Sequence, residues 1–85
     1  MTERSLSYRA LAARLRQFGA IEDAVRGKGA HRMWFRRLAD GTLGRCPVPF
    51  HGTGTPLARS IVRNVRRSLG LSEADGVTDH AFYEG

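Results

Sequence analysis

Apolar residues recur three and four positions apart near the start of the chain. Between residues 5 and 18 this stripe consists of Tyr8, Leu11, Leu15 and Phe18. Arginines occupy positions off the stripe, and Gly19 follows it. Because a glycine readily adopts the left-handed backbone that ends a helix, the pattern predicts an amphipathic helix over residues 5–18 with a glycine stop.

Three short segments after this helix have strand character. Residues 20–25 predict a strand that runs into a turn at Gly27, Lys28 and Gly29. The runs 31–38 and 43–49 are separated by Ala39-Asp40-Gly41-Thr42, in which Asp-Gly supplies the positive backbone angles of a tight hairpin turn. We therefore expect a β-hairpin here.

The two faces of the first hairpin strand differ in composition. Alternation along a strand assigns one face to His31, Met33 and Phe35, and the other to Arg32, Trp34 and Arg36. The first face is predicted to be buried and the second to be a basic face with one aromatic ring. Trp34 could stack on a base, or it could pack under a helix.

A second helix is predicted near the C-terminal third of the chain. Pro47 and Pro49 place the preceding strand at a sheet edge, and residues 50–54 form a loop. Thr55 suits the N-cap, Pro56 the first helical turn, and Gly70-Leu71 a left-handed cap, so the helix is expected over residues 56–69. One stripe of this helix is apolar, and the opposite one consists of Arg59, Arg63, Arg66 and Arg67.

The predicted order α-β-β-β-α indicates an α+β domain. Two helices would pack on one face of a three-stranded antiparallel sheet, which suits a chain of 85 residues. Residues 1–71 form this single domain. Residues 72–85 are acidic, show no periodicity and are expected to be a mobile or partner-ordered tail.

Charge is distributed unevenly along the chain. Residues 1–71 contain all 14 basic residues, 13 of them arginine, and four acidic ones, for a net charge of +10. The other four acidic residues follow Ser72. A field this positive attracts polyanions, and arginine grips phosphate through paired hydrogen bonds, so nucleic acid is the expected partner. A GC-rich genome would also favour arginine over lysine.

Several classes of protein are excluded by composition. The single cysteine, Cys46, allows no internal disulfide and no zinc knuckle. The spacing of Cys46 and the three histidines matches no metal-ligand pattern, so we expect neither a metal nor another cofactor. No apolar run is long enough to span a membrane and the N-terminus lacks a signal-peptide pattern, so a cytoplasmic, non-membrane protein is expected.

Short motifs over residues 5–72 resemble the HicA toxins, whose fold is a reduced relative of the double-stranded-RNA-binding domain. After Gly19, the segment Lys28-Gly29-Ala30-His31 is similar to the family's turn with its catalytic histidine, although Ala30 stands where the family usually has serine. A second match covers Val48-Pro49-Phe50-His51. The last matches are Arg59-Ser60-Ile61 and Gly70-Leu71-Ser72.

The resemblance implies the toxin of a type II toxin-antitoxin system, an mRNA interferase. Such a protein would cleave mRNA without a metal ion, with His31 as the catalytic residue, and would be neutralised by a HicB-like antitoxin. It would be monomeric when free and part of a hetero-oligomer with the antitoxin. The residues expected to bind RNA are Lys28, Gly29, Arg32, Arg36, Arg59, Arg63, Arg66 and Arg67.

The residues alone leave other interpretations open. An imidazole can transfer protons near neutral pH, so His31 suits RNA cleavage, but it could instead pack in the sheet beside its strand neighbours. His51 is either a second acid or base, or an ordinary loop histidine. A non-catalytic RNA-binding module would need only the basic face. A cationic domain that binds an acidic protein is the third alternative.

Overall fold

The computed structural model describes residues 4–23 and 31–85. Within them the helices are α1 (Tyr8–Gln17), α2 (Arg59–Ser68) and α3 (Asp79–Glu84), with a 3₁₀ turn, η1, at Glu73–Asp75. The strands are β1 (Leu6–Ser7), β2 (Ile21–Asp23), β3 (His31–Arg37), β4 (Leu43–Pro49) and β5 (Pro56–Leu57).

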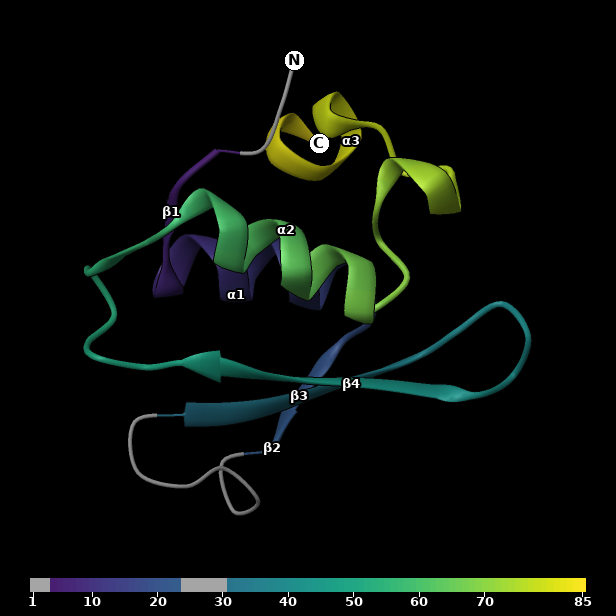
Figure 1. The fold of residues 1–85 in the computed structure, drawn as a ribbon, viewed down its shortest axis with the longest axis horizontal. Helices are drawn as coiled ribbons and strands as arrows, with labels where there is room; N and C mark the ends of the chain where they lie inside the picture. The colour runs from purple at the N-terminus through teal and green to yellow at the C-terminus, as the bar shows by residue number, and fades with distance from the viewer. Residues whose placement is uncertain (1–3, 24–30) are drawn as a thin grey trace.

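These elements stack in layers (Figure 1). β2, β3 and β4 form an antiparallel sheet in that order, and β1 and β5 form a separate two-stranded sheet. α1 and α2 lie together on one side of the larger sheet, and α3 lies beyond them, away from that sheet. The predicted α+β class with a three-stranded antiparallel sheet is therefore confirmed.

α1 begins and ends through local backbone chemistry. The Ser7 hydroxyl accepts a hydrogen bond from the Ala10 N–H at 3.1 Å, which caps the first turn. At the other end Gly19 has a φ of +86°, and the N–H groups of Gly19 and Ala20 return to the carbonyls of Arg16 and Leu15. This is the Schellman arrangement, so the predicted glycine stop is confirmed.

α2 starts later than predicted. Pro56 and Leu57 are extended and pair with Ser7 and Leu6, and the N-cap is Ala58 rather than Thr55. This pairing buries Leu57 and joins the entrances of both helices, which explains why the chain stays extended there. The predicted C-terminal end holds: Gly70 has a φ of +70°, and Leu71 is buried after it.

The hairpin between β3 and β4 is present, but its turn differs from the one expected. The Leu38 N–H donates to the Thr42 carbonyl at 2.8 Å, and the Gly41 N–H donates to the Leu38 carbonyl at 3.0 Å. Gly41 has a φ of +89°, whereas Asp40 does not adopt a positive φ. The Asp40 carboxylate instead accepts from the Thr42 N–H and hydroxyl, so one left-handed residue suffices for this longer loop.

The prediction of which sheet face is buried is wrong. Trp34 is fully buried under the helices, together with its register partner Cys46. His31, Met33 and Phe35 lie on the opposite face, which no element covers among the described residues. Both faces of β3 carry apolar residues, so alternation identified the two sets without showing which one the helices cover.

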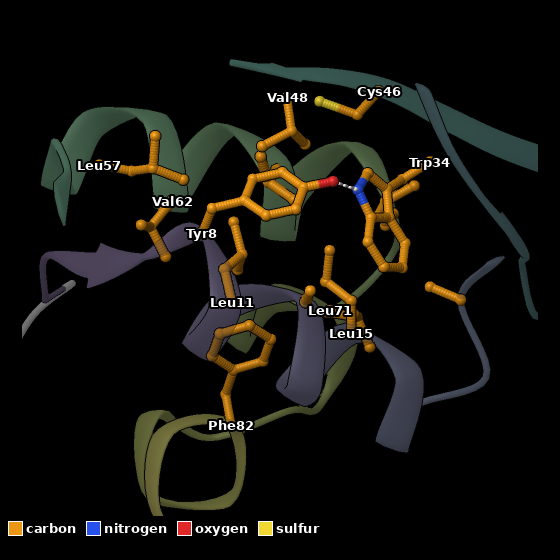
Figure 2. Close-up of a cluster of buried hydrophobic side chains, with 14 residues drawn as sticks. Tyr8, Leu11, Leu15, Trp34, Cys46, Val48, Leu57, Val62, Leu71 and Phe82 are labelled. Atoms are coloured by element: carbon orange, nitrogen blue, oxygen red, sulfur yellow. Dashed lines mark hydrogen bonds between the residues drawn. The ribbon is translucent and has the colours of Figure 1, made fainter. Parts of the chain in front are cut away.

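One hydrophobic core connects the layers (Figure 2). Tyr8, Leu11 and Leu15 of α1 meet Val62 of α2, with Val48 and Cys46 supplied by the sheet side. α2 comes very close to β4 at Gly44. A Cβ added there would lie only 2.8 Å from the Ser68 carbonyl oxygen, so the close approach requires glycine.

The C-terminal segment corrects the prediction of a separate mobile tail. Phe82 of α3 is fully buried and stacks on Phe18, with ring centroids 5.8 Å apart. Glu84 forms an ion pair of 2.9 Å with Arg4, which joins the two ends of the described chain. Residues 72–85 therefore belong to the same folded unit as the rest.

β4 is an edge strand, as its prolines predicted. It pairs with β3 and with no other strand of the described residues. Pro47 lies opposite Met33, and Pro49 lies opposite His31. Proline has no N–H to donate. These two positions therefore suit the outer side of an edge strand, where no neighbouring strand accepts a hydrogen bond.

Candidate nucleic-acid interface

His31 is the first residue of β3 and projects from the uncovered face of the sheet. Its side chain is exposed, and Met33 and Phe35 follow it along the same face. The neighbouring strand contributes Pro49 directly opposite His31. A solvent-exposed imidazole at the end of a sheet is accessible to a large substrate such as RNA.

Lys28 and Gly29, which were expected to hold RNA phosphate beside His31, lie outside the described residues. In this part of the site, the residues whose positions are described therefore begin with His31, the first residue of β3.

His51 lies near the same end of the sheet as His31. It is exposed and follows β4 by two residues, and Pro49 at the end of β4 is the register partner of His31. The Thr55 hydroxyl donates to the His51 carbonyl oxygen at 3.2 Å, which fixes the backbone of this loop. The two histidines predicted from sequence are thus brought to one end of the molecule.

Two arginines that sequence reasoning did not select share the face of His31. Arg37 ends β3 and Arg45 is central in β4, and register places both on the uncovered side. Both are exposed; the Arg37 guanidinium donates to the Gly41 carbonyl at 3.0 Å. The even spacing from His31 along β3 is the signal that could have found Arg37, whereas the face of Arg45 follows from the register between β3 and β4. We call this surface of Ile21, Asp23, His31, Met33, Phe35, Arg37, Leu43, Arg45, Pro47 and Pro49 the open sheet face.

α2 carries a second cationic surface. Arg59, Arg63 and Arg67 are exposed and four residues apart, so their Cα atoms advance about 6 Å along the helix at each step. Among the described residues no ion pair neutralises them. Because α2 covers the other side of the sheet, the structure does not bring this stripe together with His31.

Arg66, the fourth predicted member of that stripe, is instead buried in the fold. Only 1 % of the residue is exposed. Its guanidinium donates to the carbonyls of Leu71 and Val77, both at 2.9 Å, and to the Asp79 carboxylate at 2.8 Å. It also lies 4.6 Å from the centroid of the Phe82 ring. Arg66 therefore holds the C-terminal segment on the domain and cannot contact RNA.

Arg36 also has a structural position. Its Nε donates to the Phe18 carbonyl at 2.9 Å, and its NH1 donates to the Leu69 carbonyl at 3.1 Å. These carbonyls belong to the C-cap residues that follow α1 and α2, where the helix dipoles concentrate negative charge. One guanidinium thus caps both helices, and RNA binding by this half-buried side chain stays a prediction.

Trp34 is not available for stacking on a base. Its indole N–H donates to the Tyr8 hydroxyl at 3.0 Å inside the core (Figure 2). The Tyr8 hydroxyl in turn donates to the Glu22 carboxylate at 2.8 Å. Burial, and then the hydrogen bond to Glu22, raise the pKa of Tyr8 to about 12. Of the two positions considered for the Trp34 ring, the structure shows the one packed under the helices.

Arg32 lies on the helix side of β3, at the end where the strand begins. Its NH1 is 3.2 Å from the Glu22 carboxylate, and its guanidinium lies 4.1 Å from the centroid of the Phe50 ring. One third of its side chain remains exposed. Arg32 is therefore half-buried and keeps part of its guanidinium open to solvent.

Neither a metal-binding cluster nor a membrane-spanning helix is found in residues 4–23 and 31–85. No group of three or more His, Cys, Asp or Glu side chains in these two ranges is arranged to hold a metal ion. None of the helices in the described part of the chain has the length and apolar character needed to cross a bilayer.

The described residues thus define a small α+β domain with an exposed histidine and two cationic surfaces. No protein-family model, curated protein or solved structure matches the chain. Membership of the HicA family accordingly stays a prediction from the residue pattern.

Proposed function

We propose that this protein is a metal-independent endoribonuclease, the toxin of a toxin-antitoxin pair, which cleaves mRNA with His31. The observation that carries the proposal is the exposed imidazole of His31 on the open sheet face, which also presents Arg37 and Arg45. A cationic surface around a proton-transfer group is what cleavage of an RNA strand requires.

The chemistry uses groups that RNA itself provides. A base removes the proton of a ribose 2′-hydroxyl, and the 2′-oxygen attacks the adjacent phosphorus. The P–O5′ bond breaks, and an acid protonates the departing 5′-oxygen. The products are a 2′,3′-cyclic phosphate and a 5′-hydroxyl, with no net change in protons. An imidazole can perform either proton transfer near neutral pH.

The roles are assigned from position. His31 is the principal proton-transfer group, and His51 at the same end of the sheet is the second. Lys28, three residues before His31 in the chain, stabilises charge that develops on phosphorus. Arg37 and Arg45 hold phosphates of the strand.

The antitoxin partner is proposed to cover the open sheet face. Ile21 is 68 % exposed and Leu43 is 50 % exposed, and both lie on this face. Large apolar side chains left in solvent on an uncovered sheet favour a protein partner. A HicB-like antitoxin seated there would cover His31 and form a hetero-oligomer with a toxin that is monomeric when free.

The test combines growth with purified components. Induced expression of the wild type is expected to arrest growth and degrade mRNA, whereas His31→Ala does neither. The matched control is His80→Ala, because His80 is exposed on α3, an element that the proposal does not use. In vitro, the wild type is expected to cleave RNA in the presence of EDTA and leave 2′,3′-cyclic phosphate ends.

Three results would contradict the proposal: cleavage by His31→Ala at the wild-type rate, cleavage that EDTA abolishes, or no cleavage by any variant. If the wild type binds RNA without cutting it, and His31→Ala binds equally well, the protein is a non-catalytic RNA-binding module. If salt-dependent RNA binding is absent as well, the cationic surface serves an acidic protein.

A further inference from the structure

A pocket lies between α1 and the end of the sheet where β3 begins. Its volume is about 260 Å³. On the helix side it is lined by Tyr8, Arg9, Ala12 and Arg16, which share one face of α1 because they follow each other at helical spacing. Ala12 is the short side chain between the two arginines, and it leaves the hollow open.

The opposite wall comes from three separate segments. Glu22 of β2, Arg32 of β3, and Phe50 and Thr53 of the loop after β4 complete the lining. This loop is tied to α1 by two hydrogen bonds, from the Arg9 N–H to the Thr53 carbonyl at 3.0 Å and from the Arg9 guanidinium to the Thr53 hydroxyl at 3.1 Å. The pocket is therefore formed by the fold and not by one flexible side chain.

The lining has an excess of positive charge. Three guanidiniums, those of Arg9, Arg16 and Arg32, face one carboxylate, that of Glu22. Glu22 bonds to Arg16 at 3.1 Å and to Arg32 at 3.2 Å, so it orients both without neutralising the set. A guanidinium has five N–H donors, and the hydrogen bonds to Glu22 and Thr53 use one donor from each arginine. Donors remain for an anion.

The position of the pocket relates it to the proposed cleavage site. Arg32 directly follows His31, so their Cα atoms are about 3.8 Å apart, although the two side chains point to opposite faces of the strand. β3 begins at His31, so both residues lie at the same end of the sheet. The pocket, which Arg32 lines, is therefore next to the proposed cleavage site along β3.

We propose that this pocket binds a backbone phosphate of the RNA strand next to the one that is cleaved, through Arg9, Arg16 and Arg32. The inference rests on the proposed ribonuclease function and adds a defined substrate subsite to it. Phosphate recognition by guanidiniums fixes the register of the strand without selecting its sequence. Ala12 and the loop at Thr53 set the space that the phosphate occupies.

The test measures the salt dependence of binding to a fluorescent 2′-O-methyl RNA oligonucleotide, which lacks the attacking hydroxyl and stays intact. Removal of one cation that binds a phosphate of a single strand reduces the slope of log K against log salt by about 0.7. Arg16→Gln is expected to reduce the slope by about this amount and the affinity about tenfold. Arg9→Gln combined with Arg16→Gln is expected to reduce the slope by about 1.4.

Arg14→Gln is the matched control. Arg14 lies two residues from Arg16 on the same helix, so it points to the opposite side, where it bonds to Gln17. Its removal changes the net charge equally but leaves the pocket intact. Ala12→Met is a second variant that fills the hollow without changing charge, and it is expected to weaken binding about tenfold.

The outcomes separate this inference from the function on which it rests. If Arg16→Gln and Arg14→Gln change the slope equally, the pocket does not bind phosphate, whatever the wild type does to RNA. If Arg16→Gln reduces the slope and the wild type fails to cleave unmodified RNA, the subsite stands and the nuclease proposal fails. Circular dichroism of each variant confirms that it is folded, and Arg16→Gln retains a testable fold because more than half of that side chain is exposed.

Discussion

Replacement of Arg66 by methionine tests whether this buried cation holds the C-terminal segment on the domain. The guanidinium bonds to Leu71, Val77 and Asp79, and its side chain is almost wholly enclosed. Methionine keeps much of the apolar volume and removes the charge and all donors. Three acceptors are then left without their donor, and the Asp79 carboxylate is left without its counter-ion.

The expected decrease in stability follows from these interactions. Removing one partner of a buried, hydrogen-bonded ion pair costs about 3–5 kcal/mol. The Asp79 side chain is 21 % exposed and regains water after the substitution, which places the cost at the lower end, about 3 kcal/mol. For a domain of this size that corresponds to a fall in Tm of roughly 12–24 °C.

Urea unfolding followed by the fluorescence of Trp34 measures this directly, because Trp34 is the single tryptophan and is fully buried. The control is Arg63→Met, an exposed position on the same helix, for which a change within about 0.5 kcal/mol is expected. If both substitutions lower the free energy of unfolding equally, Arg66 does not anchor the segment and the reasoning from its burial is refuted.

Three further predictions use other buried groups. Phe82→Ala should lower the free energy of unfolding by about 3–4 kcal/mol, since the ring is fully buried; a decrease below about 1 kcal/mol in urea unfolding would contradict its place in the core. In a Tyr83→Phe background, absorbance at alkaline pH should show the Tyr8 phenol ionising near pH 12. Because this pKa is raised above the ordinary 10.0, the stability that it contributes is complete below pH 10 and is lost as the pH rises through about 12, and ionisation near pH 10 in the native protein would refute it. Burial also raises the pKa of the Cys46 thiol, so a thiol reagent should modify Cys46 at neutral pH only as fast as the protein unfolds, and rapid modification of the native protein would show that the thiol is accessible.

The features predicted correctly from sequence are those that depend on neighbouring residues. Gly19 and Gly70 end their helices because a left-handed residue after the last turn satisfies nearby carbonyls, whatever the rest of the fold does. The edge position of β4 follows from Pro47 and Pro49 in the same way.

The features that were missed depend on residues far apart in the chain. Trp34 is buried under the helices, where Tyr8, 26 residues earlier, accepts its N–H. Arg66 differs from Arg63 in facing the C-terminal segment with Val77 and Asp79, whose position the sequence pattern could not supply. The helix periodicity gave one arginine stripe, and tertiary contacts divided it into exposed and buried members.

The candidate site shows the same division. His31 was selected from a local motif, and it is exposed at the strand start. The cluster of Arg9, Arg16 and Arg32 could not be recognised, because its members come from α1 and β3 and line one pocket only in the folded chain.

The prolines of β4 also determine how copies of this chain can meet. An exposed edge strand presents free N–H and C=O groups to which another chain can add a strand, and this is a common route to aggregation. At Pro47 and Pro49 the outward donors are missing, so the end of β4 beside His31 offers a poor template for strand addition. Strand addition by a second copy is thereby disfavoured at this end of β4, and a molecule that approaches His31 there meets side chains on the sheet face.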